Sequence, residues 1–418
     1  MNELLHIGIA RRDISPPQPR FLHPSGMGRK RPTEGVLDPL YFEALAISVG
    51  GETAFLLSGD VIDYPYPWIL RIRESVAAAT GCDPRRLLFS CNHNHCSSPV
   101  PTDASPEARK AWEEANEHMI NGAIQACMEA FANRRPAEIA FCTLNLPEPI
   151  TQNRRIRLSS GTCLNCWGAG AFQPFGQKLV EPAGDDNTRV DALCFREVGA
   201  TAPFGIFISY ASHQHLYELP YFSGEFVGGA KRAIEKRIPG ATAMQSTQAC
   251  GDLDIHCIHP MPDEHEAQVQ WFRDSQHRLG ERFADAVVPE IAKAVYSRPT
   301  QMRHAYVSTE EEPTDAQKPS YILNHLCVGD IAMVSFPGEV MFEFGQWLYQ
   351  QSPFPRLFPL AYNGSGGVGM YLPAEHHYEE GSYEVMRGPD YWRPEFARRR
   401  PTEEIFERMV QTLRELKG

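Results

Sequence analysis

Residues 87–95 read LLFSCNHNH, an apolar stretch that ends in two histidines one residue apart. On an extended chain, residues i and i+2 face the same side, so His93 and His95 point in one direction. A second pair, His213 and His215, follows the apolar stretch 204–210. Neutral imidazole is a common zinc ligand, and strand ends hold such ligands rigidly. One His-x-His is more often just a polar strand end, but two in the same setting indicate a metal site.

A third ligand is expected at the end of another strand. Glu339 follows the apolar residues 331–336 and a Pro-Gly turn, which matches the position of both histidine pairs. Taken alone, an acidic residue after such a turn is usually just solvated. Asp252 and Asp254 follow a further strand-like stretch, where their carboxylates either orient ligand imidazoles or form an ordinary Asx turn.

The composition excludes several classes of protein. The chain has 418 residues, 42% apolar and 22% charged, as expected of a globular protein with a substantial core. A net charge of −12 argues against a nucleic-acid surface, and the basic runs 29–31 and 398–400 are typical of solvated surface. No apolar run reaches the roughly 18 to 20 residues that span a bilayer. We expect a small-molecule substrate, and the sequence does not indicate an oligomeric state.

The cysteines favour a reducing compartment. There are 11, an odd number, and no secretory leader precedes the strand-like residues 7–10. We therefore expect reduced thiols and a cytoplasmic protein. Cys163 and Cys166 have the spacing of half a zinc ribbon, but no second pair of this kind follows, which disfavours a structural zinc there.

Strand-like and helix-like stretches alternate along the chain, so we predict an α/β fold with mixed β-sheets flanked by helices, in a single large catalytic domain over residues 1–418. Helices are expected from Ser105 to about 131, from about 263 to 295 with a bend at Pro289, and after Thr402, which would cap the last one. Strands are expected at residues 53–57, 87–91, 138–144, 204–210, 241–246, 321–328 and 331–336.

Two other metallohydrolase patterns were compared with these spacings. In the His-x-His-x-Asp-His run of metallo-β-lactamase-like enzymes, the last two positions are occupied here by Ser97 and Ser98, so the second metal would lack its ligands. An amidohydrolase-type barrel also begins with His-x-His at a strand end. It stays open as an alternative, although the regular eightfold alternation of strand and helix is not recognisable.

The segment 92–97, NHNHCS, and eight further segments match the motifs of a known family. Residues 92–97 are similar to the Thr-His-Thr-His-Ser-Gly of the neutral or alkaline non-lysosomal ceramidases, in their N-terminal zinc-dependent catalytic domain. Further matching segments run through most of the chain in the family's order: residues 8–17, 35–41, 153–155, 211–213, 251–252, 337–339, 371–373 and 381–384.

This resemblance implies roles for individual residues. His93, His213, Glu339 and Tyr371 would be zinc ligands. His95, Arg154 and Tyr383 would line the site and contact the reacting group, with Tyr378 as an alternative to Tyr383.

Two departures from the family pattern bear on the substrate. The family's Gly-Asp-x-Ser-Pro segment reads GDLDI at residues 251–255, so Asp254 replaces the serine beside the scissile bond. The chain also ends soon after these motifs, without the family's C-terminal β-rich domain. We therefore expect a substrate other than ceramide.

The expected mechanism is hydrolysis of an amide by a zinc-activated water. Arg154 and Tyr383 would stabilise the oxyanion, and His95 or His215 would protonate the leaving amine. Asp254 would either accept a proton or repel a polar group next to an acyl chain. Three alternatives stay open: hydrolysis of an ester, lactone or glycoside, a binding protein that has lost catalysis, and iron or manganese in place of zinc.

Overall fold

A computed structural model describes residues 4–25, 33–165, 179–216, 219–255, 262–308, 321–364, 371–386 and 401–418. Cys166, His256 and the basic runs 29–31 and 398–400 lie outside these ranges. Within them, the main feature is an eight-stranded mixed sheet of the order β16-β14-β13-β8-β1-β4-β5-β6. Its strands are β1 (His6–Asp13), β4 (Tyr41–Val49), β5 (Glu52–Gly59), β6 (Leu87–Cys91), β8 (Arg135–Asn145), β13 (Arg189–Glu197), β14 (Gly205–Tyr210) and β16 (Thr242–Ser246).

A second sheet of four strands has the order β18-β19-β20-β22. It comprises β18 (Met302–Ser308), β19 (Ile322–Val328), β20 (Ile331–Ser335) and β22 (Arg356–Leu360). Side chains alternate along β20: Ile331 and Met333 pack in one core together with Leu45 and Leu56 of the large sheet, whereas Val334 faces a different core. The alternation follows from the two-residue period of a strand, and it stacks the two sheets face to face.

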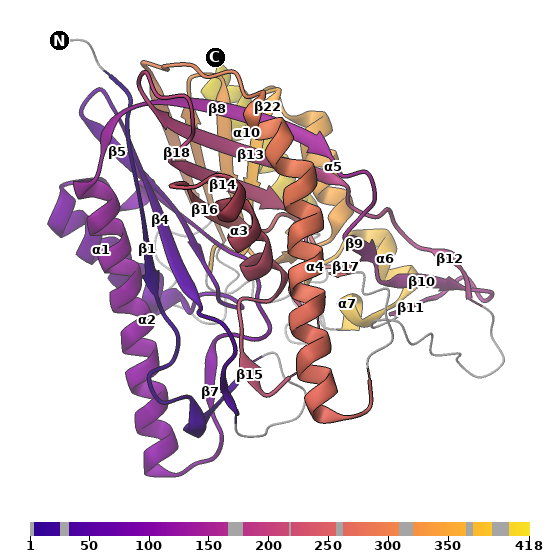
Figure 1. The fold of residues 1–418 in the computed structure, drawn as a ribbon. Coiled ribbons are helices and arrows are strands. Elements are labelled where there is room, and N and C mark those ends of the chain that lie inside the picture. The colour runs from indigo at the N-terminus through magenta and orange to yellow at the C-terminus, as the bar shows by residue number, and fades with distance from the viewer. Residues whose placement is uncertain are drawn as a thin grey trace.

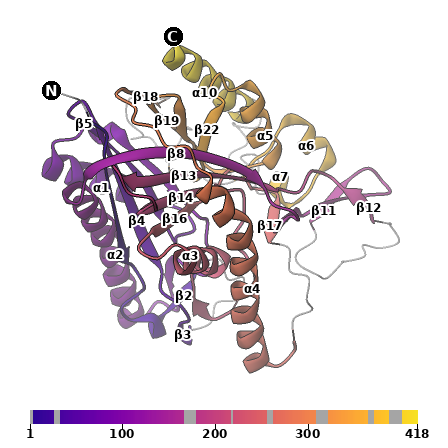
Figure 2. The same cartoon turned by 45° about the horizontal axis from the view of Figure 1, so that its top comes forward.

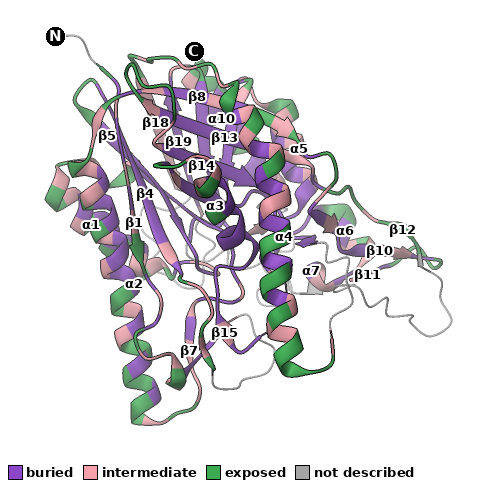
Figure 3. Cartoon of the chain, viewed as in Figure 1, coloured by how far each residue is buried: buried purple, intermediate pink, exposed green. Residues whose placement is uncertain are grey.

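Helices cover the outer faces of both sheets. On the large sheet lie α1 (Tyr66–Thr80), α2 (Pro106–Ala132), α3 (Glu225–Arg237) and α4 (His265–Ala292), and on the small one α5 (Phe342–Gln351) and α10 (Pro401–Lys417). Figure 2 shows the resulting order of helices, strands, strands and helices. In Figure 3 the long helices α2 and α4 each have one buried face and one exposed face.

Short elements gather at one side of the molecule, as both Figure 1 and Figure 2 show. They are β9 (Thr151–Asn153), β10 (Arg155–Leu158), β11 (Cys163–Asn165), β12 (Leu179–Pro182), β17 (Leu253–Ile255), α6 (Glu375–Glu380) and α7 (Tyr383–Met386). Nearer the strand ends, β21 (Glu339–Val340) pairs with β23 (Tyr371–Leu372), β2 (Leu22–Pro24) with β7 (Pro99–Pro101), and β3 (Gly35–Val36) with β15 (Tyr221–Phe222). The single-turn 3₁₀ helices are η1 (Pro19–Phe21) and η2 (Pro84–Arg86).

The predicted fold class, α/β with mixed sheets flanked by helices, is confirmed, and each predicted strand is present to within about three residues at either end. Helix α2 begins after Ser105, whose hydroxyl accepts a hydrogen bond from the Ala108 amide. Pro289 lies inside α4 without dividing it. The cap predicted at Thr402 is wrong: α10 begins at Pro401, and the Thr402 hydroxyl instead donates to the Pro373 carbonyl at 2.9 Å.

The described part of the chain contains no (β/α)₈ barrel, because its strands form two stacked sheets. The amidohydrolase alternative is therefore wrong. None of the described helices combines the length and apolar character needed to span a bilayer. The nine cysteines among the described residues form no disulfide bonds. The extent of the domain over residues 1–418 stays a prediction.

Candidate metal centre

Three parallel strand pairs direct their carboxyl ends to one place. The pairs are β5 with β6, β14 with β16, and β20 with β22. Ligand sites of open α/β sheets typically lie beyond the carboxyl ends of such strands. His93 and His95 follow β6, His213 and His215 follow β14, and Glu339 follows β20.

The two histidine segments are held side by side although β6 and β16 are opposite edges of the large sheet. The sheet curves so that these edges approach each other: the Thr247 amide donates to the Cys91 carbonyl at 3.2 Å. Beyond the strands, Asn94 and Gln214 form an isolated parallel bridge, and the His95 amide donates to the Gln214 carbonyl at 3.0 Å. The curvature therefore brings together residues that are more than a hundred positions apart.

Three imidazoles meet at this point. The Nε2 atom of His95 lies 3.3 Å from Nε2 of His93 and 2.8 Å from Nε2 of His213. One ligand atom from each of the three rings lies within 4.8 Å of the others. His93 Nδ1 is 2.6 Å from the Ile62 carbonyl, which leaves Nε2 for the cluster. Burial and the nearby Arg154 guanidinium hold the pKa of His213 well below its ordinary value, so its ring is neutral as metal binding requires.

Glu339 brings a carboxylate to the same place. Its Oε2 atom lies 3.3 Å from Nε2 of His93 and 4.0 Å from Nδ1 of His213. The parallel pairing of β21 with β23 sets Glu339 opposite Tyr371. Burial alone would raise the pKa of Glu339, but the His93 ring and the Tyr371 hydroxyl outweigh it and lower the pKa, so the group is ionised.

The donor set fits a zinc ion. Two ligand atoms of one tetrahedral zinc, each bonded at about 2.0–2.1 Å, are about 3.3 Å apart. The separation of Nε2 of His93 from Oε2 of Glu339 has this value, 3.3 Å. Oε2 of Glu339 has no hydrogen-bond partner among the described residues although it is buried. A cation would satisfy this oxygen.

Arg154 lies in the loop between β9 and β10 and is fully buried. Its Nε donates to Glu384 at 2.7 Å, and its Nη2 donates to the Gly251 carbonyl at 2.7 Å and to the Tyr371 hydroxyl at 2.9 Å. Its Nη1 lies 3.5 Å from Nδ1 of His213. The guanidinium is thus fixed beside the imidazole cluster, with Nη1 as the edge turned toward it.

Asp254 and His215 border the same region. The Asp254 residue is 3% exposed, and its Oδ1 lies 4.0 Å from Nη1 of Arg154. Burial raises the pKa of Asp254, and the neighbouring Arg154 and His215 oppose this rise. The His215 ring lies 4.9 Å from the His95 ring, measured between centroids.

One of the two candidate tyrosines, Tyr383, contacts Tyr371, a predicted ligand. Its ring is 5.6 Å from the Tyr371 ring between centroids, at 75°. Its backbone amide donates to the Asn165 side chain at 3.0 Å, which fixes the start of α7. Tyr378 lies in α6, one element earlier in the chain.

Sequence reasoning missed three residues of this region. Tyr362 stacks on the His93 ring with centroids 4.2 Å apart, and Glu384 holds Arg154. Asp63 lies close enough to His93 and Glu339 to interact with both charges, and burial raises its pKa to about 6. The available signal was position, since Tyr362 follows β22 and Asp63 follows β5 just as the histidines follow their strands.

A second group of ligand-type residues is less suited to a metal. Glu343, His376 and His377 place one potential ligand atom each within 4.8 Å of one another. Nδ1 of His377 accepts a hydrogen bond from the Ala374 amide at 3.0 Å, so the ring proton is on Nε2, the nitrogen 3.9 Å from Glu343. This arrangement favours contact between the ring proton of His377 and the Glu343 carboxylate over binding of a metal ion.

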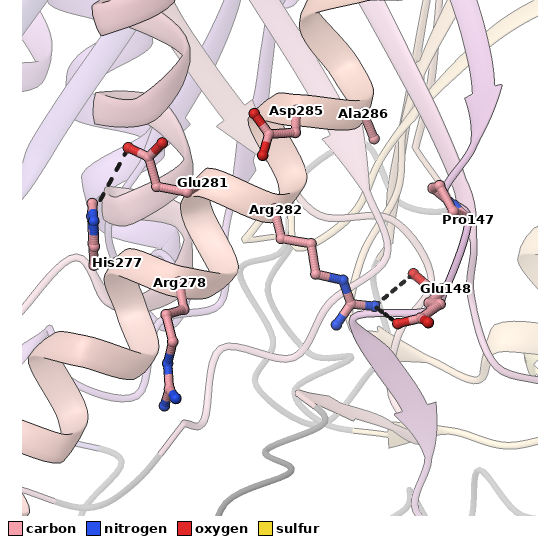
Figure 4. A pocket seen from close by; sticks show the side chains of 8 residues that line it. All are labelled: Pro147, Glu148, His277, Arg278, Glu281, Arg282, Asp285 and Ala286. Carbon is pink, nitrogen blue, oxygen red and sulfur yellow. Dashed lines mark hydrogen bonds and ion pairs between the residues drawn. The ribbon is translucent and has the colours of Figure 1, made fainter.

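Figure 4 shows a separate pocket between α4 and the segment with Pro147 and Glu148. Its volume is about 530 Å³. Charged side chains pair within it: Arg282 lies 3.3 Å from the Glu148 carboxylate, and Glu281 lies 4.0 Å from His277. None of the candidate metal-centre residues lines it.

Comparisons with known proteins agree with the geometry at the level of the fold. No protein-family model matches the sequence, and neither does any curated protein. Among solved structures, the chain is similar to the neutral ceramidase from Pseudomonas aeruginosa, with a TM-score of 0.72 and 13% identity over 99% of this chain and 75% of that one. It is also similar to a ceramidase complexed with C2, with a TM-score of 0.72 and 12% identity over 99% and 76% of the two chains. The chain has a ceramidase-like fold.

Proposed function

We propose that this protein is a metal-dependent hydrolase that cleaves an amide bond, and that it is a distant member of the ceramidase family with a substrate other than ceramide. The observation that supports this most is the convergence of three imidazoles and a carboxylate from strand ends far apart in the sequence. We assign His93, His213, Glu339 and Tyr371 as ligands. The similarity to two ceramidases along nearly the whole chain supports the reaction class.

A zinc ion held there would supply a Lewis acid and a water molecule of lowered pKa. In such a hydrolysis a water oxygen would add to the amide carbonyl carbon, the C–N bond would break, and a proton from the water would reach the leaving nitrogen, giving a carboxylic acid and an amine. Arg154 and Tyr383 donate hydrogen bonds to the carbonyl oxygen as it gains charge. His95 and His215 carry the proton, since imidazole accepts and releases protons near neutral pH.

Arg154 is prepared for this role by its fixed position. Three hydrogen bonds, to Glu384, Gly251 and Tyr371, hold its guanidinium before any substrate binds. A donor that is already oriented stabilises developing charge without a cost of reorganisation. Nη1 lies on the side of the guanidinium that is turned toward the imidazole cluster, 3.5 Å from Nδ1 of His213.

The test combines metal analysis with turnover. We expect about one zinc per chain by elemental analysis, hydrolysis of at least one amide in a panel of amides, esters, lactones and glycosides, and loss of this activity with a chelator. His93→Ala should lose both metal and turnover, whereas His118→Ala, a change at an exposed position of α2, should keep both. Full activity of His93→Ala would disprove the proposal.

A second candidate function follows from Asp254, the residue that replaces the family's serine. If that serine is essential to the family's chemistry, the chain retains the ligands and has lost catalysis. Stoichiometric zinc without turnover of any compound in the panel would favour a binding protein. Turnover of an ester, lactone or glycoside, and of no amide, would mean that the protein is a metal-dependent hydrolase that cleaves a different bond.

A further inference from the structure

Two buried carboxylate oxygens lie next to Arg154 without a hydrogen-bond partner among the described residues. They are Oδ1 of Asp254 and Oε2 of Glu384. The two residues are 3% and 0% exposed. A buried carboxylate oxygen that is not hydrogen-bonded costs free energy, so such an atom needs an explanation.

The contacts of Asp254 and Glu384 show which of the two carboxylates lacks a paired cation. Arg154 binds Glu384 closely, at 2.7 Å, whereas Asp254 lies 4.0 Å from Nη1. Among the described residues, Arg154 is therefore the cation shared by these two carboxylates, and only Glu384 is in hydrogen-bond contact with it. The Glu339 carboxylate does not change this count, because it is assigned to the metal.

The nearest imidazole ligand does not supply the missing charge. His213 lies 3.5 Å from the same Nη1 and is assigned to the metal, which binds imidazole in its neutral form. The unmatched negative charge is thus enclosed beside the reacting centre, where water is largely excluded. A buried charge in such a setting is normally paired.

We infer that the site takes an amide that carries an ammonium group close to the scissile bond, and that Asp254 and Glu384 receive this group. The inference rests on the proposed function and specifies its substrate class. Asp254 is then a specificity-determining residue: its Oδ1 accepts a charge-assisted hydrogen bond from the ammonium group. Glu384 then has a double role: Oε1 accepts from Arg154 and fixes it, and Oε2, which has no hydrogen-bond partner among the described residues, accepts from the ammonium group.

The experiment compares three small amides on the zinc-loaded, full-length protein: N-(2-aminoethyl)acetamide, N-(2-hydroxyethyl)acetamide and N-propylacetamide. They have similar length and differ in carrying an ammonium group, a hydroxyl or neither. Because a hydrogen bond to a charged group is worth more than a neutral one, kcat/KM for the ammonium compound should exceed that for the propyl compound by about ten- to a hundred-fold.

Asp254→Asn keeps the shape of the side chain and removes its charge. The ratio of kcat/KM between the ammonium and propyl compounds should fall to within about threefold, whatever the absolute rates. Asp252→Asn is the matched control. That neighbouring carboxylate is equally buried, but its oxygens already accept from Asn153 and from the Phe342 amide at 2.8 Å, so this variant should keep the wild-type ratio.

The outcomes separate the inference from the proposed function. Cleavage of all three amides with equal efficiency overturns the inference and leaves the proposed function standing, as expected if a protonated His215 is the counter-charge. Equal preference for the hydroxyl and ammonium compounds also overturns it, because a neutral donor would then suffice. If no amide is cleaved, the proposed function fails, and calorimetric titration with the same compounds then tests the inference. Tighter binding of the ammonium compound that is lost in Asp254→Asn supports the inference. Equal affinities for the three compounds overturn it.

Discussion

His93 has a backbone conformation that residues with a side chain seldom adopt. Its φ is 52°, and the φ of Tyr362, which stacks on its ring, is 58°. Each such residue costs on the order of 1–3 kcal/mol, so it persists only where its surroundings fix it. For His93 these surroundings include the Ile62 carbonyl, 2.6 Å from Nδ1. The strained backbone thereby directs Nε2 to the point where the other imidazoles meet.

His95 provides the sharpest test of the ligand set. Its Nε2 is as close to Nε2 of His93 as Glu339 is, 3.3 Å, yet we assign it to proton transfer. We expect His95→Ala to keep about one zinc per chain and to lose roughly 10²- to 10⁴-fold in kcat, the usual contribution of an acid–base group. Elemental analysis after dialysis checks this, with His93→Ala as the metal-free reference. Loss of zinc from His95→Ala would make it a ligand.

A buried network of ion pairs is hydrogen-bonded to the segment that carries His93. Lys231 donates to Glu43 at 2.9 Å and to Asp60 at 3.0 Å, and Asp60 accepts from the side chain of Asn92, the neighbour of His93. Lys231→Met leaves both carboxylates with less positive charge nearby, which should lower the free energy of unfolding by about 3–5 kcal/mol. Urea denaturation measures this free energy. As the control, Arg71→Met, which breaks the surface pair with Glu117, should change the free energy of unfolding little. An equally small effect of Lys231→Met would contradict the role of the network.

Single elements were largely predictable because the signals for them are local. The apolar runs that became β5, β6, β14 and β20 have the length and composition of buried strands, and Ser105 with the following proline marks the start of α2. The start of α10 was misplaced because Thr402 makes a long-range hydrogen bond to Pro373 in place of a cap. Tyr362 and Glu384 were missed for the same reason: their partners, His93 and Arg154, are far away in sequence.

Gly251 tests how an element positions a ligand. Its amide donates to the Val340 carbonyl at 2.7 Å, and a Cβ placed there would lie 2.5 Å from the Glu339 carbonyl oxygen. Gly251→Ala must therefore displace β21 and the Glu339 carboxylate with it. We expect weaker zinc binding, by at least about tenfold, and a lower Tm. Isothermal titration with zinc measures the affinity.

The control for this change is Gly205→Ala in β14. A Cβ at Gly205 meets only side chains, the nearest being Cδ1 of Ile9 at 3.3 Å. This variant should bind zinc as tightly as the wild type. Unchanged affinity in Gly251→Ala would mean that the Glu339 carboxylate does not depend on the position of β21.

At the scale of the whole molecule, the site exists because two sheets end together. The large sheet supplies the histidines from near both of its edges, and the small sheet supplies Glu339 through the turn after β20. Sequence patterns predict strands and their polar ends, but they do not predict how a sheet curves or which strand ends meet. Curvature depends on pairings between distant strands, and the bridge between Asn94 and Gln214 is the outcome of many such pairings. The candidate ligands could therefore be named from the sequence, and their mutual distances could not.

The same stacked architecture makes stability depend on pH. His325 in β19 is fully buried, and burial lowers its pKa to about 3. In the unfolded chain the pKa of histidine is about 6.5, so between these values the unfolded state binds a proton that the folded state does not. The stabilisation is complete above pH 6.5 and is lost as the pH falls toward 3, by up to about 1.4 kcal/mol per pH unit for each such histidine.

His325→Leu should remove the contribution of one proton from this slope, because leucine fills much of the same space without a titrating group. Urea unfolding followed by circular dichroism at several pH values between about 7 and 4 gives the slope for each protein. His118→Gln changes a histidine on the exposed side of α2 and should leave the slope as in the wild type. If His325→Leu and the wild type lose stability in parallel, burial does not hold the His325 ring neutral, and other groups cause the acid sensitivity.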